Sequence, residues 1–234
     1  DCELRPDWIA TARACLEAHP EVAVACGRRR ERAPEVSVYN RLCDREWNTP
    51  VGEAKACGGD ALIRADAFAA VGGFRESLIA GEEPELCLRL RAKGWKIRRL
   101  DAEMTLHDAA ITRFGQWWRR SRRAGFAFSE GAALHGAPPE RHWVRETRRA
   151  LLWGLALPLA ALGIGSLVSP RGFLLLLVYP AQVVRMAARD GWRDRAAWEF
   201  ALFGVLGKFP EMVGVIEHRL GALGGREARL IEYK

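Results

Sequence analysis

The sequence lacks the paired cysteine spacing on which most structural zinc sites are built, because it contains no CxxC motif. All of its cysteines lie in the first half of the chain: Cys2, Cys15, Cys26, Cys43, Cys57 and Cys87. With no metal-binding spacing among them, we expect the thiols to be reduced and buried as small apolar side chains, with no catalytic or metal role.

A recognisable targeting segment is also missing. The chain opens on a polar turn, Asp1 to Trp8, with neither an initiator methionine nor the apolar core of a signal peptide. Internal repeats and low-complexity stretches are absent from the 234 residues. Because the opening reads like sequence from the middle of a domain, we expect the chain to be a fragment of a longer protein or the product of a truncated gene model.

Acidic residues are outnumbered, and the formal net charge is +7, which favours an anionic partner. The relevant arginines gather directly before the most apolar part of the chain: Arg113, Arg119, Arg120, Arg122, Arg123, Arg145, Arg148 and Arg149. This placement favours a membrane surface or phosphate groups. A nucleic-acid partner is disfavoured, since the run adjoins an uncharged stretch and forms no known nucleic-acid-binding motif.

The stretch Ala150–Val168 contains no charged residue. It is long enough to cross a membrane, although Pro158 would bend it. A second uncharged stretch, 172–184, is shorter than the roughly 20 residues of a full span. Arginines at both outer ends predict that these ends face the cytoplasm, while Arg171 at the turn is a mild contradiction. The alternative is a buried helical hairpin of a soluble domain. We predict that 198–215 is an amphipathic surface helix.

The first half alternates helical and strand patterns. Apolar residues at helical spacing predict a helix over 6–19, and the apolar run Val22–Gly27 predicts a buried strand followed by a solvated basic stretch. Further on, the patterns predict a helix within 36–47, a strand after Gly58-Gly59, and an edge strand over 96–100. Together these elements indicate an α/β sheet domain.

Glycine, proline and acidic residues mark the predicted helix ends. We expect Asp66 to cap a short helix that Gly72-Gly73 ends, and Pro84 to occupy the first position of a helix that ends at Gly94. A longer helix over 116–134 should break near Gly125. The Gly136–Pro139 segment should mark a domain boundary.

Glu83 is the strongest single candidate for chemistry. It stands before a proline at a predicted helix N-terminus, where the helix dipole keeps a carboxylate ionised, as a general base must be near neutral pH. Taken alone, an acid at this position is better explained as an ordinary helix-capping residue than as a general base.

An ordered set of motifs adds to this position: Cys57-Gly58-Gly59-Asp60, Arg64, Val71-Gly72-Gly73-Phe74, Gly81-Glu82-Glu83, and Leu86-Cys87-Leu88-Arg89-Leu90 before Gly94-Trp95. In order and spacing this set resembles the second half of the catalytic domain of family-2 glycosyltransferases. The resemblance covers roughly residues 1–131. It implies a GT-A-like, Rossmann-like sheet domain that inverts the anomeric configuration of the transferred sugar.

The same resemblance implies roles for individual residues. Glu83 matches the general base and Glu82 its neighbour, where the family usually has a Glu-Asp pair. Gly58, Gly59, Asp60 and Arg64 match the segment beside the donor sugar and acceptor. Asp1 would be the last residue of the family's Asp-x-Asp motif and, with His107, would bind Mg²⁺ or Mn²⁺. A solvated loop histidine is the alternative for His107.

A basic aromatic segment completes the resemblance, and its candidate donor- or acceptor-binding residues are Trp117, Trp118, Arg119, Arg120, Arg122 and Arg123. Arginine suits diphosphate, and tryptophan suits sugar faces or the lipid interface. An interfacial helix without any contact to substrate is the alternative interpretation.

The resulting hypothesis is a membrane-associated, metal-assisted glycosyltransferase fragment with its catalytic part on the cytoplasmic face. Its expected partners are a nucleotide-sugar donor, a glycan or lipid-linked acceptor and membrane lipids, with no nucleic acid. We expect four segments: the catalytic part at 1–135, a linker at 136–148, an apolar hairpin at 149–190 and an amphipathic tail at 191–234. The rival hypothesis is an inactive membrane-bound binding module or a truncated remnant of the same fold.

Overall fold

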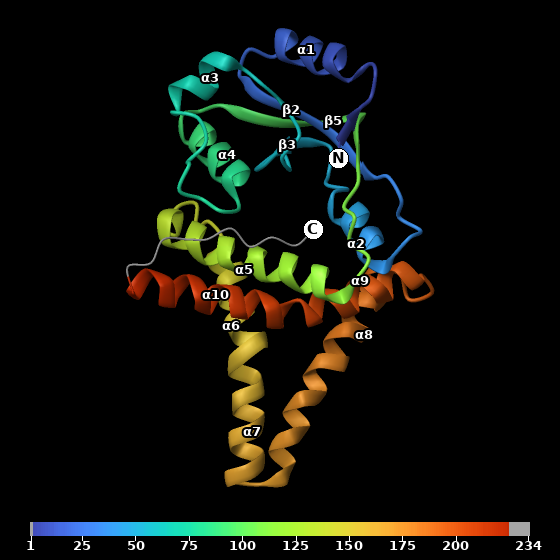
Figure 1. The fold of residues 1–234 in the computed structure, drawn as a ribbon, viewed down its shortest axis with the longest axis vertical. Coiled ribbons are helices and arrows are strands. Elements are labelled where there is room, and N and C mark those ends of the chain that lie inside the picture. The colour runs from blue at the N-terminus through green and yellow to red at the C-terminus, as the bar shows by residue number, and fades with distance from the viewer. Residues whose placement is uncertain (1, 225–234) are drawn as a thin grey trace. The chain divides into compact units, whose positions relative to one another are not determined.

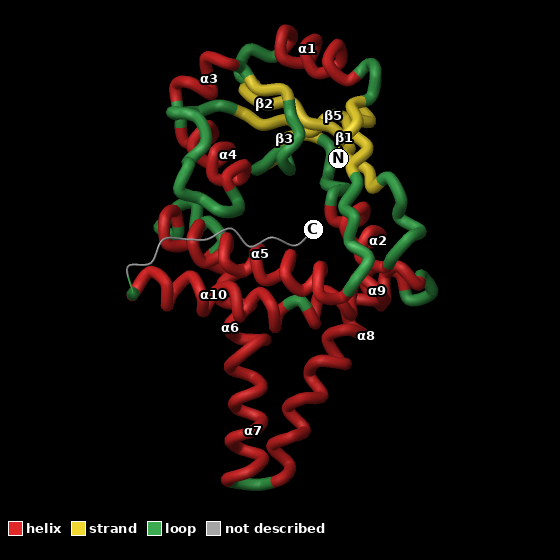
Figure 2. The backbone as a smooth tube through the Cα atoms, viewed as in Figure 1, coloured by secondary structure: helices red, strands yellow, loops and turns green. Residues whose placement is uncertain are grey.

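The computed structural model describes residues 2–224. The chain divides into two compact units, the first ending at Thr112 and the second beginning at Arg113. The first unit is mixed α/β, and the described part of the second is helical (Figures 1 and 2). The expected boundary at Gly136–Pro139 therefore lies well inside the second unit.

The first unit is built on a curled, mixed five-stranded sheet. Its strands are β1 (Cys2–Leu4), β2 (Val22–Glu31), β3 (Gly52–Ala54), β4 (Leu62–Ile63) and β5 (Lys96–His107). The two long strands, β2 and β5, run parallel, and β4 pairs antiparallel with β2. On its other side β5 pairs antiparallel with β3 near Arg98 and with β1 near Leu106.

Two strand predictions need correction. The basic stretch after Gly27 is solvated only in part, because β2 continues to Glu31 and Arg28 is only 7% exposed, whereas Arg30 and Arg32 are exposed. The Arg28 guanidinium donates to the Asp44 carboxylate at 2.9 Å, and this neutralisation permits burial. The segment from Lys96 is not an edge strand but the start of β5, which lies between β2 and the β1 and β3 strands and extends to His107.

Four helices accompany the sheet: α1 (Trp8–Ala18), α2 (Val38–Glu46), α3 (Ala65–Ala70) and α4 (Glu82–Ala92). The helix α1 buries Trp8, Ala12 and Leu16, which share one face at a spacing of four. Leu86 and Leu90 of α4 are fully buried in the same core. These helices confirm the α/β interpretation of this half.

The starts of two helices differ from the prediction. Arg64, not Asp66, is the N-cap residue of α3, and Asp66 lies in the first turn, where its Oδ1 accepts from the N–H of Ala67 at 2.8 Å. The helix α4 begins at Glu82, with Gly81 as its N-cap at φ +81°. Pro84 therefore sits in the first turn but not at its first position.

The second unit contains α5 (Phe114–His135), α6 (Val144–Leu151), a π-helical turn (Leu152–Ala156), α7 (Leu157–Leu167), a 3₁₀ segment (Pro170–Leu177), α8 (Val178–Gly191), α9 (Arg195–Leu206) and α10 (Lys208–Leu223). The expected linker is thus partly helical, since α6 starts at Val144 and continues into α7. The segment expected to be one amphipathic helix is two, divided at Gly207.

Helix α5 is continuous and does not break at Gly125 as predicted. Gly125 is buried where α10 crosses: a Cβ there would lie 1.9 Å from the carbonyl oxygen of Glu211. On α10, a Cβ at Gly214 would lie 2.0 Å from the carbonyl oxygen of Arg122. Glycine is needed at both positions because the two backbones approach closely, so here it marks a helix contact and not a break.

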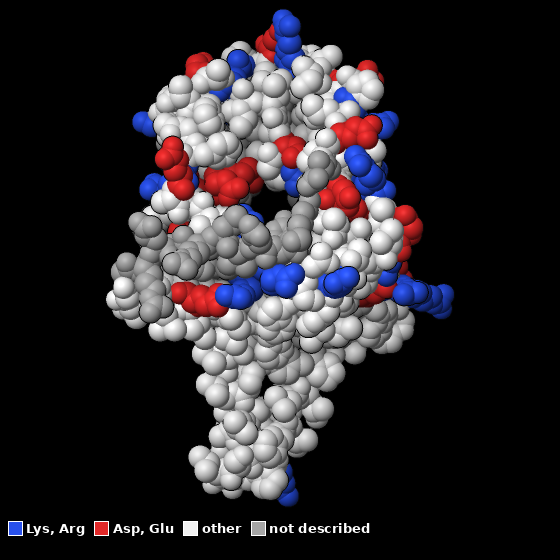
Figure 3. Space-filling view, in the orientation of Figure 1, with Lys and Arg blue, Asp and Glu red and all other residues white. Residues whose placement is uncertain are grey.

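The two apolar helical stretches project as a hairpin (Figure 1). Val144–Leu167 and Pro170–Gly191 are both long and apolar enough to cross a membrane, and only 22% and 11% of their most apolar windows are buried. In the space-filling view this hairpin is nearly free of charged side chains (Figure 3). Such exposure is unlike a buried hairpin in a soluble core and supports two possible membrane spans.

Candidate functional site around Glu83

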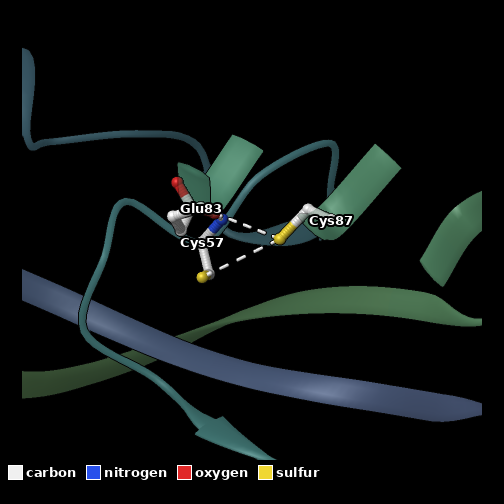
Figure 4. Close-up of side chains that lie close together, drawn as sticks. All are labelled: Cys57, Glu83 and Cys87. Atoms are coloured by element: carbon white, nitrogen blue, oxygen red, sulfur yellow. Dashed lines mark hydrogen bonds between the residues drawn. The ribbon is translucent and has the colours of Figure 1, made fainter. Parts of the chain in front are cut away.

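Glu83 lies in the first turn of α4 and is held by contacts to one of its two carboxylate oxygens. Its Oε1 accepts a hydrogen bond from the backbone N–H of Cys57 at 2.5 Å and a second from the Cys87 thiol at 3.1 Å (Figure 4). The other oxygen points away from the two cysteines and has no hydrogen-bond partner among the described residues (Figure 4). Glu83 is one of three acidic residues in the first turn of α4, the end of a helix at which acidic side chains are common.

Cys57 and Cys87 gather around this carboxylate. Their sulfur atoms are 3.9 Å apart, and Cys57 is 8% and Cys87 0% exposed. The hydrogen bond to Cys57, together with burial, raises the pKa of the Cys87 thiol. The prediction of burial is confirmed for Cys57 and Cys87, as it is for Cys26 and Cys43, but it is wrong for Cys2, which is exposed, and Cys15 is only half-buried. The sequence analysis missed that Cys57 and Cys87 meet at Glu83. The one available signal was the i, i+4 spacing of Glu83 and Cys87 on a helix.

The glycine turn after Cys57 leads to a partly buried ion pair. Gly58 and Gly59 adopt φ of +82° and +101°, which side chains disfavour. Beyond them, Asp60 Oδ2 accepts from Arg29 Nε and from Thr105 Oγ1, both at 2.7 Å. Asp60 thus links this turn to β2 and β5. Arg29 and Thr105 were not predicted, because nothing in their local sequence distinguishes them.

Arg64 and Glu82 take other positions. The Arg64 guanidinium donates to the carbonyl oxygens of Val22 at 2.8 Å, His19 at 3.3 Å and Leu16. It therefore ties the end of α1 to the start of β2 and does not join the Glu83 cluster. Glu82 is exposed at the first residue of α4.

A second ion pair, between Glu85 and Arg89 of α4, holds this helix in place. Glu85 is 1% exposed, and both of its oxygens accept from Arg89, with Oε2 at 2.7 Å from Nη2. Arg89 also donates to the carbonyl oxygens of Gly73, at 2.7 Å, and Val71. The pair therefore holds the Gly72-Gly73 turn against α4. The sequence analysis named Arg89 only as part of the Leu86–Leu90 motif and assigned a role to neither residue.

The predicted Mg²⁺ or Mn²⁺ ligands do not assemble within the described residues. Asp1 lies outside them. His107 is the last residue of β5 and not part of a loop; its Nδ1 is 2.7 Å from Cys2 Sγ, and its ring meets Trp47 edge-on with 5.1 Å between centroids. Over residues 2–224 the single group of three potential metal ligands is Cys57, Glu83 and Cys87. Two sulfurs and one oxygen do not suit a hard cation.

The basic aromatic segment forms the first half of α5 in the second unit. Trp117 is 6% exposed and packs against Phe203 with ring centroids 5.0 Å apart, so it serves the core of that unit and not a sugar surface. Arg122 forms an ion pair with Glu217 of α10, with Nε 2.7 Å from Oε2. Arg119 is exposed, while Trp118, Arg120 and Arg123 are half-buried.

The chain matches no protein-family model and no curated protein sequence.

Proposed function

We propose that this chain is part of a membrane-associated, inverting glycosyltransferase of the family-2 kind, and that Glu83 is its general base. The observation that carries the proposal is the placement of Glu83: a carboxylate at a helix N-terminus, fixed through one oxygen to the residue before Gly58-Gly59-Asp60. The Gly81-Glu82-Glu83 motif and Cys57, the first residue of the Cys57-Gly58-Gly59-Asp60 motif, are distant in sequence and thus meet at one carboxylate. The GT-A-like fold and the nucleotide-sugar donor belong to the same proposal.

The arrangement suits proton removal from an acceptor hydroxyl. Glu83 Oε1 is occupied by its two donors, which leaves Oε2 to accept the proton. The hydroxyl oxygen would then form a bond to the anomeric carbon as the bond to the nucleoside diphosphate breaks, and the diphosphate departs with the electron pair. This single in-line displacement inverts the configuration at that carbon.

The proposal also includes a membrane anchor and a divalent cation. The hairpin formed by Val144–Leu167 and Pro170–Gly191 would anchor the protein in the bilayer and bring it to a lipid-linked or glycan acceptor. Arginines outside both ends favour the cytoplasmic face for the catalytic part. The expected Mg²⁺ or Mn²⁺ stays a prediction that rests on Asp1.

The test is nucleotide release from a panel of nucleotide sugars by the protein in native membranes. Loss of a general base should lower turnover by about 10²–10⁴-fold, so Glu83→Gln should nearly abolish release. The matched control is Glu76→Gln, because Glu76 is exposed in the same unit and should keep full turnover. Adding EDTA and then Mg²⁺ or Mn²⁺ tests the expected cation.

Undiminished release by Glu83→Gln would refute the assigned base. No release from any donor by the unaltered protein, with acceptor-containing membranes supplied, would favour the rival hypothesis of a membrane-bound binding module. Equal loss of release in Glu76→Gln would show that the assay reports folding and not proton transfer.

A further inference from the structure

We propose that Cys57, Glu83 and Cys87 bind a single zinc ion, or a metal ion of similar softness. All three ligand atoms lie within 4.8 Å of one another, and they come from two elements, the turn before Gly58 and helix α4 (Figure 4). Three protein ligands would leave a fourth tetrahedral position open to water, the arrangement found in reactive rather than purely structural zinc sites.

The distances between the ligand atoms fit tetrahedral coordination. With zinc–sulfur bonds of about 2.3 Å, two sulfurs in tetrahedral positions are about 3.8 Å apart; the two here are 3.9 Å apart. A sulfur and a carboxylate oxygen should be about 3.5 Å apart on the same ion, and Cys87 Sγ lies 3.1 Å from Glu83 Oε1. A small shift of the Glu83 carboxylate closes this difference.

The ligands are also held in place before any ion arrives. Cys87 follows Leu86 on α4, and both are fully buried. Cys57 is fixed by its backbone N–H bond to Glu83. Since a binding site loses affinity when its ligands must first be ordered, this rigidity favours ion binding.

The carboxylate distinguishes this cluster from ordinary buried cysteines. A thiol that only fills space in a core needs no charged neighbour, whereas here a carboxylate oxygen lies 3.1 Å from the Cys87 sulfur. Cys26 and Cys43 are equally buried, but neither belongs to a group of three potential ligands within the described chain. Sulfur ligands select zinc and similar ions over Mg²⁺.

Binding exchanges protons for the ion. The Cys57 and Cys87 thiols each release a proton to solvent, and the two thiolates and the Glu83 carboxylate then donate electron pairs to the metal. The hydrogen bonds that now join the three side chains are replaced by metal bonds. Oε1 faces the sulfurs and Oε2 points away (Figure 4). The zinc ion would therefore bind Oε1, and its binding does not depend on the proposed transferase activity.

The experiment uses the 234-residue chain, purified in detergent, reduced and stripped of metal. Titration with Zn²⁺ against a chromogenic chelator should give one ion per chain. Titration with Co²⁺ should give a thiolate-to-cobalt charge-transfer band and the visible absorption of tetrahedral cobalt. Since loss of a mere supporting residue costs about 10–100-fold in metal affinity, Cys57→Ser, Cys87→Ser and Glu83→Gln should each weaken binding by more than about 100-fold.

The matched controls are Cys15→Ser and Cys43→Ser, which remove thiols outside the cluster and should leave zinc affinity unchanged. A second measurement needs no variant: zinc should slow alkylation of Cys57, the less buried of the two cluster thiols, in the unaltered chain, located by peptide mass spectrometry, and leave alkylation of Cys2 unchanged. Binding of less than one ion, equal weakening by Cys15→Ser, or alkylation of Cys57 that zinc does not slow would each overturn the assignment. Nucleotide release plays no part in these readouts, so failure here leaves the proposed transferase standing.

Discussion

Asp60 Oδ2 lies 2.7 Å from Nε of Arg29, and the two side chains are only 22% and 15% exposed. The pair joins the turn after Gly58-Gly59 to strand β2, and Thr105 of β5 donates to the same oxygen. One carboxylate oxygen therefore connects the two long strands of the sheet with the turn that leads to the Glu83 cluster.

Replacing Asp60 by Asn should lower the free energy of unfolding of the first unit by about 1–3 kcal/mol, because Arg29 would keep its charge in a largely buried place without its partner. The control is Glu103→Gln, which removes the carboxylate facing Arg30 in a pair that is 44% and 49% exposed. This exposed pair should cost under about 1 kcal/mol. Urea unfolding followed by circular dichroism measures both, and equal losses would contradict the structural role of Asp60.

Substituting Arg89 in the Glu85–Arg89 pair should destabilise the first unit by a similar amount. Arg89→Lys would lose the paired geometry on a carboxylate that is 1% exposed, as well as the bonds to the carbonyls of Gly73 and Val71. Breaking a buried pair typically costs about 3–5 kcal/mol, and a lysine that partly restores the charge should cost about half of this. The exposed bond of Arg91 to the Lys55 carbonyl, at 3.2 Å, makes Arg91→Lys the matched control. Hydrogen exchange of the α4 amides should accelerate in the first variant only.

The sequence predicted elements whose signals are local. Trp8, Ala12 and Leu16 recur at helical spacing, and the uninterrupted apolar run from Val22 to Cys26 matches a buried strand; both were found where expected. The predictions that failed depended on contacts with residues distant in sequence. The strand β2 continues through its arginines because Asp44, Asp60 and Glu103 neutralise them from other elements.

The same limit applies to the candidate site. Glu83 could be chosen from the sequence because its helix position and motif context are local. Cys57 lies 30 residues from Cys87, and no spacing rule connects them, so their meeting required the fold. Gly125 was taken for a helix break because its reason, the backbone of Glu211, is on another helix.

Because α5 and α10 cross closely in the second unit, substituting its glycines by alanine should affect stability differently at different positions. Gly125→Ala and Gly214→Ala would each place a Cβ about 2 Å from a backbone oxygen of the partner helix, and such overpacking should cost about 1–3 kcal/mol or more. Around Gly221, also on α10, the space that a Cβ would enter is open to a distance of 4 Å, so Gly221→Ala should stabilise the helix by about 0.5–1 kcal/mol. The midpoint of thermal unfolding in detergent should be lower for Gly125→Ala and Gly214→Ala than for the unaltered protein, and it should not be lower for Gly221→Ala.

Glu130 gives the second unit a predictable pH dependence. It lies on α5, its Oε2 is buried with no hydrogen-bond partner among the described residues, and desolvation raises its pKa from 4.5 to about 7. The folded protein therefore keeps this proton at pH values where the unfolded chain has released it. The contribution to stability is full below pH 4.5 and is lost as the pH rises to about 7.

Because the side chain is only partly buried, solvent screening should limit this loss to about 2 kcal/mol or less. Glu130→Gln cannot ionise, so the variant should be more stable than the unaltered protein at about pH 8 and similar to it near pH 4.5. Glu146→Gln, on the neighbouring helix α6, is the control and should follow the unaltered protein at every pH. Unfolding midpoints measured from about pH 4.5 to about pH 8 test this prediction. Parallel curves for Glu130→Gln and the unaltered protein would show that Glu130 does not make stability depend on pH.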